Sequence, residues 1–268
     1  MTTTPTIHSH APGDTGPDQS TRTNINVDPD PASVKTKARL AGALYLVIFI
    51  VAPFAFFVVP DRIIVDGDAA NTAANLVDNE GLFRAGMVAE TIVIATEIIL
   101  AGLLYGLLRP VSRPLSLAAA FARFGEALVQ AVNLLTSGIV LLVLGGTGYL
   151  AVFESEQLDA LATLFIDANQ FGVMVWGLLF GLHLALLGHL IYRSGFWPRP
   201  IGALVMVASL GYLGQSYMHL AAPQHDGIFE VLVVVLAAPG ELAFTIWLLW
   251  KGANVDRWYR RHRDSRPV

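Results

Sequence analysis

The stretch from Leu115 to Leu144 combines an apolar helix pattern with side chains that can do chemistry. Arg123, Glu126, Gln130 and Asn133 follow one another at intervals of three, four and three residues, which puts them on one face of an α-helix. About 20 apolar residues cross a hydrocarbon core about 30 Å thick, so the stretch predicts a membrane span. Ionisable groups cost at least a few kcal/mol near the bilayer centre, so we expect this face to turn toward other helices.

Three further apolar stretches carry an ionisable residue at a similar depth. Glu97, His183 and Glu241 lie, like Glu126, roughly a dozen residues from the ends of their stretches. Arg123 precedes Glu126 by three positions, the spacing of an ion pair on one helix face. Three glutamates outnumber one arginine and one histidine, so at least one carboxylate is expected to be unpaired or protonated. These five residues predict a polar pocket that binds a ligand or carries protons.

A second polar group lies nearer the other side of the predicted bundle. Glu90 shares a helix face with Glu97, seven positions further on, while Asn133 and His219 add hydrogen-bonding groups at that level. We expect the two groups to form a polar funnel that opens outward and ends near Arg123. The outer members are Glu90, Asn133, Asp167, Asn169, Gln215, Tyr217, His219 and Glu230.

Two simpler interpretations of these residues stay open. The polar groups can satisfy one another, with Arg123 pairing with a glutamate and His183 donating to a neighbouring carbonyl. They can also supply metal ligands, yet no two of them recur at a helix spacing such as H-E-x-x-H. We therefore predict no metal site, and the cofactor stays unknown.

Composition indicates what kind of protein must position these groups. The 268 residues are 54% apolar and only 14% charged, against about 25% charged in an average globular protein. We predict an all-α integral membrane protein with the lipid bilayer as its first partner. The chain has no cysteine, which excludes a disulfide framework, a thiolate nucleophile and a thiolate metal site. No feature predicts binding to nucleic acid.

Hydropathy predicts six spans, and two of them contain a proline in their interior. We expect Pro53 to bend the first span, and Pro239-Gly240 to break the sixth just before Glu241. The predicted spans are Leu40 to Val59, Gly86 to Leu108, Leu115 to Leu144, Phe171 to Tyr192, Pro200 to Ala221 and Ile228 to Trp250.

The charged residues predict the orientation. Lysines and arginines flank the spans on the side of the two termini, and only Arg62 and Arg84 fall in the other loops, where aspartates and glutamates concentrate. The positive-inside rule then predicts both termini in the cytoplasm, at the inner (plasma) membrane of a bacterium. We expect a disordered tail over residues 1–34, a membrane domain over 35–252 and a basic tail over 253–268 that binds anionic lipid.

Two segments outside the spans have short helical patterns. One is capped by Asp66 or Asp68 and the other runs through Leu158 and Ile166, which predicts two amphipathic helices on the outer rim. An offset of 86 residues also aligns the chain with itself from Gly86/Gly172 onward and superposes two Arg-Pro turns. It suggests a tandem repeat of a rim helix plus a helix hairpin, as in parallel-repeat transporters.

Several segments resemble a bacterial family of multi-pass membrane proteins known as domain of unknown function 4386. They are ARLAGALYL (38–46), GDAANTAANL (67–76), GLLYGLLRPVSR (102–113), FGLHLALLGHLIYRSGFWPR (180–199) and LWKG (249–252). The resemblance covers most of the membrane domain. It implies a multi-pass helical domain, and it implies no activity for any residue.

The buried acids are compatible with three functions. The first is binding of a small or lipophilic molecule in the polar pocket, for transport or sensing. The second is a membrane-embedded enzyme that acts on a lipid or isoprenoid, with a protonated glutamate as general acid and His183 as base. The third is an accessory or immunity-type protein in which the polar groups only position helices.

Overall fold

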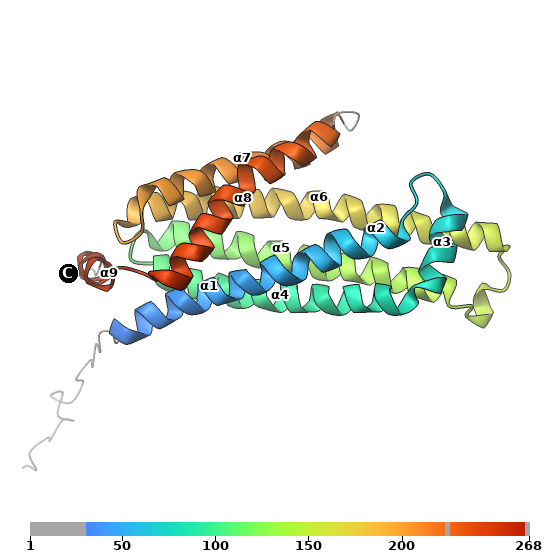
Figure 1. Cartoon of the computed structure of the whole chain (residues 1–268), viewed down its shortest axis with the longest axis horizontal. Helices are drawn as coiled ribbons and strands as arrows, with labels where there is room; N and C mark the ends of the chain where they lie inside the picture. Colours follow the sequence, from blue (N-terminus) through green and yellow to red (C-terminus); the bar gives the residue numbers. More distant parts are fainter. Residues whose placement is uncertain (1–30, 223–225, 266–268) are drawn as a thin grey trace, which may run out of the picture. The chain divides into compact units, whose positions relative to one another are not determined.

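The computed structural model describes residues 31–222 and 226–265. Its elements in this part of the chain are α1 (Pro31–Pro53), η2 (Phe54–Val58), α2 (Val59–Ile63), α3 (Ala69–Asp78), α4 (Glu80–Leu108), α5 (Arg113–Leu144), η3 (Gly148–Leu150), α6 (Ser155–Ser194), α7 (Arg199–Ala221), α8 (Asp226–Trp250) and α9 (Val255–Asp264). Six segments are long and apolar enough to cross a membrane: Ala32–Ile63, Glu80–Leu108, Arg113–Leu144, Ser155–Ser194, Arg199–Ala221 and Val231–Trp250. The predicted all-α, six-span architecture is confirmed. The long helices run alongside one another in Figure 1.

The first span begins earlier than predicted and passes its proline without ending. Helix α1 starts at Pro31, so residues 31–34 are helical rather than part of a tail, and Val34 is buried in the core. The remainder of the predicted tail, residues 1–30, lies outside the described residues. After Pro53 the chain forms the π-helical turn η2 and then α2. Proline removes a backbone donor and crowds the preceding turn, and a wider π turn accommodates both effects.

Of the two predicted rim helices, one is separate and one is not. Helix α3 is the first, and Figure 1 shows it lying across the ends of the long helices. The predicted second rim helix is instead the beginning of α6, which continues without a break from Ser155 to Ser194. No glycine or proline interrupts residues 155–171, so nothing in the backbone ends the helix there. The predicted tandem repeat stays a prediction.

The sixth span also differs from its prediction, because α8 is continuous through Pro239. Gly240 lets the next turn pack directly on α7, since a Cβ at this position would stand 2.7 Å from the carbonyl oxygen of Leu204. A proline can remain inside a membrane helix when a neighbouring helix supports the turn around it. The backbone is therefore not opened beside Glu241.

Glycines bring α6 and α7 into direct backbone contact. A Cβ at Gly188 would lie 2.8 Å from the carbonyl oxygen of Gly202, and one at Gly202 would lie 2.5 Å from the backbone nitrogen of Tyr192. Membrane helices associate closely where small residues remove side chains from the contact. By contrast, a Cβ at Gly102 or Gly106 would meet no described atom within 4 Å.

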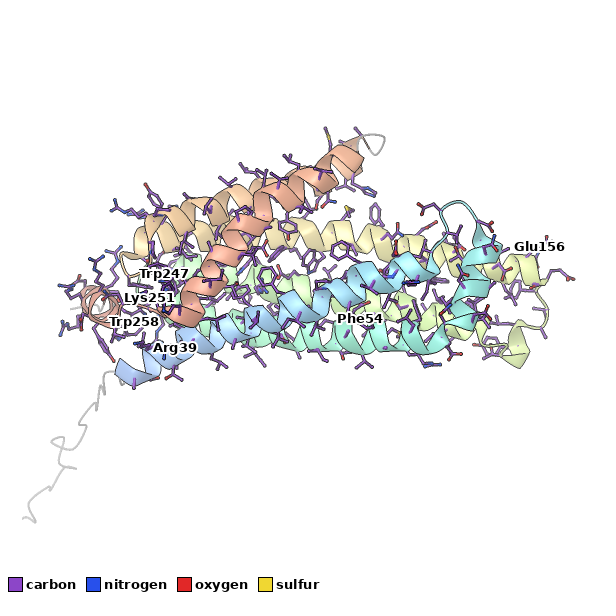
Figure 2. All side chains as sticks on the ribbon, viewed as in Figure 1. Arg39, Phe54, Glu156, Trp247, Lys251 and Trp258 are labelled. Atoms are coloured by element: carbon purple, nitrogen blue, oxygen red, sulfur yellow. The ribbon has the colours of Figure 1, made fainter. Side chains whose placement is uncertain are left out.

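The two ends of the bundle differ in their charged residues. Figure 2 labels Arg39, Lys251 and Trp258 at one end, which we call the basic end, and Glu156 at the other. Two apolar clusters occupy the core. The larger runs from Val34 to Trp258 through α1, α4, α6, α7 and α8, and the smaller joins the rim elements to α5 and α6. Along α5 the polar residues lie between Ala119 of the first cluster and Val140 of the second.

Candidate functional site

The polar face of α5 is buried against the other helices. Arg123, Glu126, Gln130 and Asn133 are 1%, 0%, 4% and 9% exposed, so no member of the face looks outward. The four side chains are buried together because their positions share one side of a helix with 3.6 residues per turn. Neighbouring helices bring Glu97 (2% exposed) and His183 (1% exposed) into the same interior. We call Glu97, Arg123, Glu126, His183 and Glu241 the polar layer.

Arg123 is at the centre of the layer. Its Nε lies 3.3 Å from Oε1 of Glu126, one turn away on α5. The guanidinium carbon lies 5.3 Å from the ring centroid of Tyr45 on α1 and 5.3 Å from that of Phe180 on α6. Two aromatic faces thus enclose the cation, an arrangement that stabilises a desolvated guanidinium electrostatically. The charge of Arg123 is held in place by three helices.

The remaining carboxyl groups act on the same cation. Glu97 on α4 and Glu241 on α8 both interact electrostatically with Arg123. Glu241 is also a hydrogen-bond partner of the Tyr212 hydroxyl on α7. The structure therefore brings together ionisable residues from α4, α5, α6 and α8, as the common depth of these residues in their spans predicted.

The tautomer of His183 is determined by its backbone partner. Nδ1 lies 2.9 Å from the carbonyl oxygen of Ala119. A carbonyl oxygen only accepts, so Nδ1 carries the hydrogen and donates it. In the neutral ring Nε2 is then an unprotonated acceptor, and it has no hydrogen-bond partner among the described residues. His183 thus offers the layer a base rather than a donor.

Many polar atoms in and around the layer are buried without a hydrogen bond inside the described part of the chain. The 3.3 Å approach of Arg123 to Glu126 is a charge contact without hydrogen-bond geometry. Buried polar groups are nearly always paired in proteins, so such a concentration is unusual. The atoms are Tyr45 Oη, Glu97 Oε2, Arg123 Nε and Nη1, Glu126 Oε1 and Oε2, Gln130 Nε2, Trp176 Nε1, His183 Nε2, Glu241 Oε1 and Thr245 Oγ1.

Comparison with known proteins identifies the domain that holds the layer. Residues 40–252 match a family model described as Domain of unknown function (DUF4386). The chain belongs to this family. An uncharacterized protein of Archaeoglobus fulgidus is similar, with 29% identity over 165 residues that make up 62% of this chain and 82% of the archaeal protein. No solved structure matches the chain.

The DUF4386 match contains every residue of the polar layer and leaves α9 outside it. The layer therefore lies within the matched region, and α9 lies beyond it. The family description assigns no activity, so the chemistry of the layer has to be argued from its geometry.

Three predicted site residues of the DUF4386 domain lie apart from the layer. Asn133 and Asn169 bind each other, since each side-chain amide donates to the other residue's carbonyl, at 3.1 and 3.0 Å. This clamp joins α5 to α6 and gives Asn133 a structural role. Glu90 is only half-buried, and His219, also half-buried, lies 6.1 Å from the ring of Phe171.

The predicted outward funnel does not form among the described residues. Its predicted member Tyr217 is 63% exposed, and Asp167 is exposed as well. The side chain of Glu230 lies outside the described residues. The rotation of each helix about its axis turns these side chains away from the interior of the bundle. The depth of a residue along its span does not reveal this rotation.

Aromatic residues next to the layer were missing from the sequence-based site. Trp176 stacks on Phe180 with centroids 4.9 Å apart, and Tyr212 meets Phe180 edge to face at 4.6 Å. Trp176, Phe180 and His183 are spaced four and three residues apart, which is a shared-face signal in the sequence. Tyr45 has a similar signal, because it follows the buried Ala38 and Ala41 on one face of α1.

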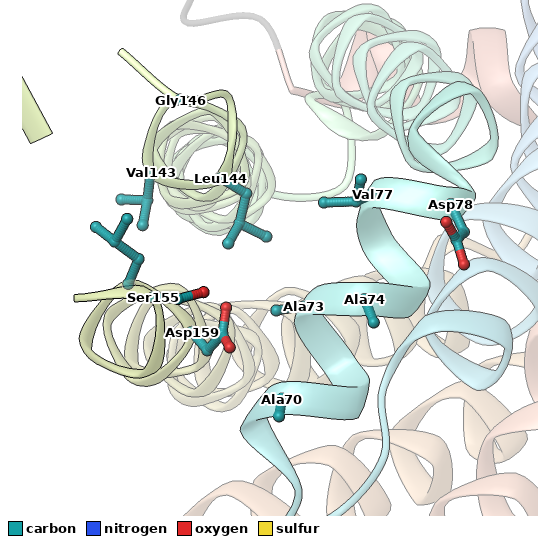
Figure 3. Close-up of a pocket in the computed structure, with 11 residues that line it drawn as sticks. Ala70, Ala73, Ala74, Val77, Asp78, Val143, Leu144, Gly146, Ser155 and Asp159 are labelled. Carbon is teal, nitrogen blue, oxygen red and sulfur yellow. The ribbon is translucent and has the colours of Figure 1, made fainter. Parts of the chain in front are cut away.

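A separate cleft of about 440 Å³ lies at the rim, and none of its lining residues belongs to the polar layer. Figure 3 shows it between α3, the end of α5 and the beginning of α6, with Ala73 facing Ser155 and Asp159. Small alanine side chains on α3 leave the space open. Alanines at 70, 73 and 74 share one side of this helix, a pattern that was visible in the sequence.

Proposed function

We propose that this protein is a membrane carrier or sensor whose polar layer binds protons together with a small polar or lipophilic molecule. The observation that supports it most strongly is the set of buried polar atoms around Arg123 that lack hydrogen-bond partners within residues 31–222 and 226–265. Intramembrane ionisable residues that face a bundle interior are typical of substrate and proton pathways. Sites of this kind lie near the bilayer midplane in transporters.

Charge balance explains why the layer would take up protons. Three carboxyl groups, on Glu97, Glu126 and Glu241, interact electrostatically with one guanidinium, and a neutral ring of His183, with Nδ1 donating to Ala119, adds no charge. Full ionisation would leave two uncompensated negative charges inside the bundle. Each costs at least a few kcal/mol in hydrocarbon, so protons or a cationic ligand must offset them.

Proton flux into liposomes tests this proposal. Purified protein is reconstituted into vesicles that contain a pH-sensitive dye, and a potassium diffusion potential drives the protons. We expect Glu126→Gln and Glu97→Gln to remove most of the flux, because each deletes a carboxyl group of the layer. Glu90→Gln is the matched control, since Glu90 lies on the same helix as Glu97 but is half-buried and apart from the layer.

The comparison is valid only for variants that purify as a single species with the melting temperature of the wild type. Equal flux in wild type, Glu126→Gln and protein-free vesicles would contradict the proton role. Equal loss in Glu90→Gln and Glu97→Gln would show that the layer is not the pathway.

One observation favours an enzyme as a second candidate, namely the buried Nε2 of His183, which has no hydrogen-bond partner among the described residues. A base beside a protonated acid can do acid/base chemistry on a lipid or isoprenoid. Mass spectrometry of lipid extracts from cells with wild-type protein and with His183→Gln distinguishes the two. A lipid product that disappears with His183→Gln supports an enzyme, and identical profiles support the carrier. If neither flux nor lipids change in any variant, an accessory role is the remaining explanation.

We place the basic end on the cytoplasmic side of the plasma membrane, with both termini there, and we assign anionic lipid as the partner of the basic C-terminal segment. The support is the concentration of lysine and arginine at this end, which the positive-inside rule associates with the cytoplasm.

A further inference from the structure

The C-terminal segment is a packed helix rather than a simple tail. Trp258 of α9 is 3% exposed, and its indole Nε1 donates to the carbonyl oxygen of Leu107 at 2.8 Å. This carbonyl belongs to the last turn of α4, where helical carbonyls have no partner within their own helix. Asn254 caps α9, its side chain accepting from the backbone nitrogen of Arg257 at 3.1 Å. One indole thus joins α9 to the end of a membrane helix.

Further hydrogen bonds attach the same segment to the connection between α6 and α7. Arg257 donates through Nη1 to the carbonyl oxygen of Gly195 at 3.0 Å. Trp197, in that connection, donates through Nε1 to the carbonyl oxygen of Gly252 at 3.0 Å. The segment from Gly252 to Trp258 therefore holds together the ends of α4, α6, α7 and α8.

The hydrogen bond from Trp258 to Leu107 keeps α9 beside the ends of the spans, from which we infer that it lies near the lipid headgroups. Four residues, 251–254, separate it from Trp250 at the end of the last span, and they extend at most about 14 Å. The headgroup region adds about 5 to 8 Å on each side of the hydrocarbon core. Figure 1 shows α9 end-on beside the bundle helices, which run across the view, so α9 lies across the direction of the spans.

The face of α9 opposite Trp258 is basic. Arg260 and Arg263 are exposed, three positions apart, and they line a cleft of about 400 Å³ with Tyr259 and Asp256. The helix has four arginines against two aspartates. Arginine forks match phosphate oxygens in pairs, and long basic side chains reach sideways to an interface. Arg260, Arg263 and Asp256 give the cleft a formal net charge of +1, which the single negative charge of a phosphodiester balances.

We propose that α9 binds the phosphodiester of an anionic phospholipid through Arg260 and Arg263, and that Trp258 transmits this binding to the bundle by stabilising its basic end. A ligand that binds the docked helix and not the undocked one stabilises the docked state by mass action. The carrier function would stand if this proposal failed, because the flux assay does not depend on α9.

Melting temperatures in nanodiscs test the proposal with full-length protein. Discs of phosphatidylcholine alone are compared with discs that contain phosphatidylglycerol, at constant ionic strength. We expect the wild type to melt at a higher temperature with phosphatidylglycerol. The double variant Arg260→Gln/Arg263→Gln is expected to lose most of this rise. Arg62→Gln/Arg84→Gln is the matched control, because it neutralises two exposed arginines at the opposite end.

Two further measurements test the coupling through Trp258 and the identity of the bound anion separately. Trp258→Phe keeps the aromatic ring and removes the indole donor, so we expect it to retain lipid binding, measured by the phosphatidylglycerol that copurifies, while the rise in melting temperature shrinks. An unchanged rise in this variant would overturn the coupling through Trp258. Inorganic phosphate added to phosphatidylcholine discs is expected to have no effect. A rise with phosphate, no rise with phosphatidylglycerol, or a full rise in Arg260→Gln/Arg263→Gln would overturn the lipid site.

Discussion

Arg123 shows how a permanent charge is kept inside an apolar bundle. Its guanidinium lies between the rings of Tyr45 and Phe180 and beside a carboxylate of its own helix. Aromatic faces attract a cation and do not take its proton, so the arginine stays charged while nearby carboxyl groups are left to gain or lose protons. The glutamates are therefore the residues of the layer whose protonation can change.

Asn133 illustrates the opposite outcome at the residue scale. Its amide nitrogen donates to the backbone carbonyl of Asn169, and the Asn169 amide donates to the backbone carbonyl of Asn133 and to the hydroxyls of Thr136 and Ser137. Gly172 leaves room for the Asn133 side chain, since a Cβ there would clash with its amide. A polar residue inside a membrane bundle can therefore join two helices by hydrogen bonds as readily as it can line a binding site.

Asp68 gives a pH prediction outside the spans. Its carboxylate accepts from the backbone nitrogen of Asn71 at 3.0 Å and from the Asn71 amide at 2.6 Å, and these bonds lower the pKa of Asp68 below its ordinary value of 3.8. A depressed pKa means that the cap contributes stability above the ordinary aspartate range and loses it as pH falls through the lowered pKa. Hydrogen exchange of α3, corrected for intrinsic rates, is expected to accelerate only below about pH 4.

The variant Asp68→Ala is expected to exchange several-fold faster in α3 already at neutral pH, because the cap is missing at every pH. Asp78→Ala is the control, since Asp78 lies at the other end of α3 and caps nothing. Protection of α3 that is insensitive to both pH and Asp68→Ala would contradict the role of the cap.

At the scale of elements, glycines allow α6 and α7 to approach each other closely. Gly181 belongs to this contact too, as a Cβ there would stand 2.7 Å from Cγ of Leu213. Two GxxxG spacings occur in the chain, at Gly102/Gly106 and at Gly177/Gly181, and they look alike in the sequence. Only the second pair meets a neighbouring helix among the described residues.

Alanine substitutions compare a glycine of the α6–α7 contact with a glycine that has open space around it. Gly202→Ala is expected to lower the free energy of unfolding by about 1–3 kcal/mol, because its Cβ would meet backbone atoms that cannot move aside. Gly102→Ala is the control and is expected to be neutral or to stabilise by up to about 1 kcal/mol, since its Cβ enters open space and alanine favours helix. Denaturation in mixed micelles measures both. Equal stabilities would contradict the close contact.

The continuity of α6 is also decided at this scale. Its first residues, predicted as a separate rim helix, have a capping box in which Glu154 and Gln157 exchange hydrogen bonds. Ala162 and Ile166 then bury this segment in the smaller apolar cluster. The predicted rim segment and the fourth span therefore form one helix of 40 residues.

At the scale of the whole molecule, an even number of crossings places both ends of the chain on one side. The protein has no cysteine, so single cysteines report accessibility without background. We expect Thr36→Cys and Ser265→Cys to react with an impermeant maleimide only after the membrane is opened. Val152→Cys, at a site that is 82% exposed between α5 and α6, is expected to react in intact cells. Different behaviour of the first two variants would contradict six crossings.

The six spans could be read from the sequence, because length and hydropathy are local properties of each segment. The starts of α1 at Pro31 and of α6 at Ser155, both well before the predicted spans, could not. The buried face of α5 could be read as well, since a helical period determines which residues share a side. Glu90 and Glu97 share a side by the same rule, yet only Glu97 is buried in the layer. Periodicity shows which residues share one side of a helix. It does not show which part of that side a neighbouring helix covers.

The sequence by itself therefore determined a six-span bundle with an excess of buried acids. Only the tertiary structure decided that Tyr45 and Phe180 enclose Arg123, that Asn133 binds Asn169, and that Trp258 reaches Leu107. The physical reason is that these contacts depend on how helices distant in the chain rotate and cross, and that geometry follows from packing over the whole bundle.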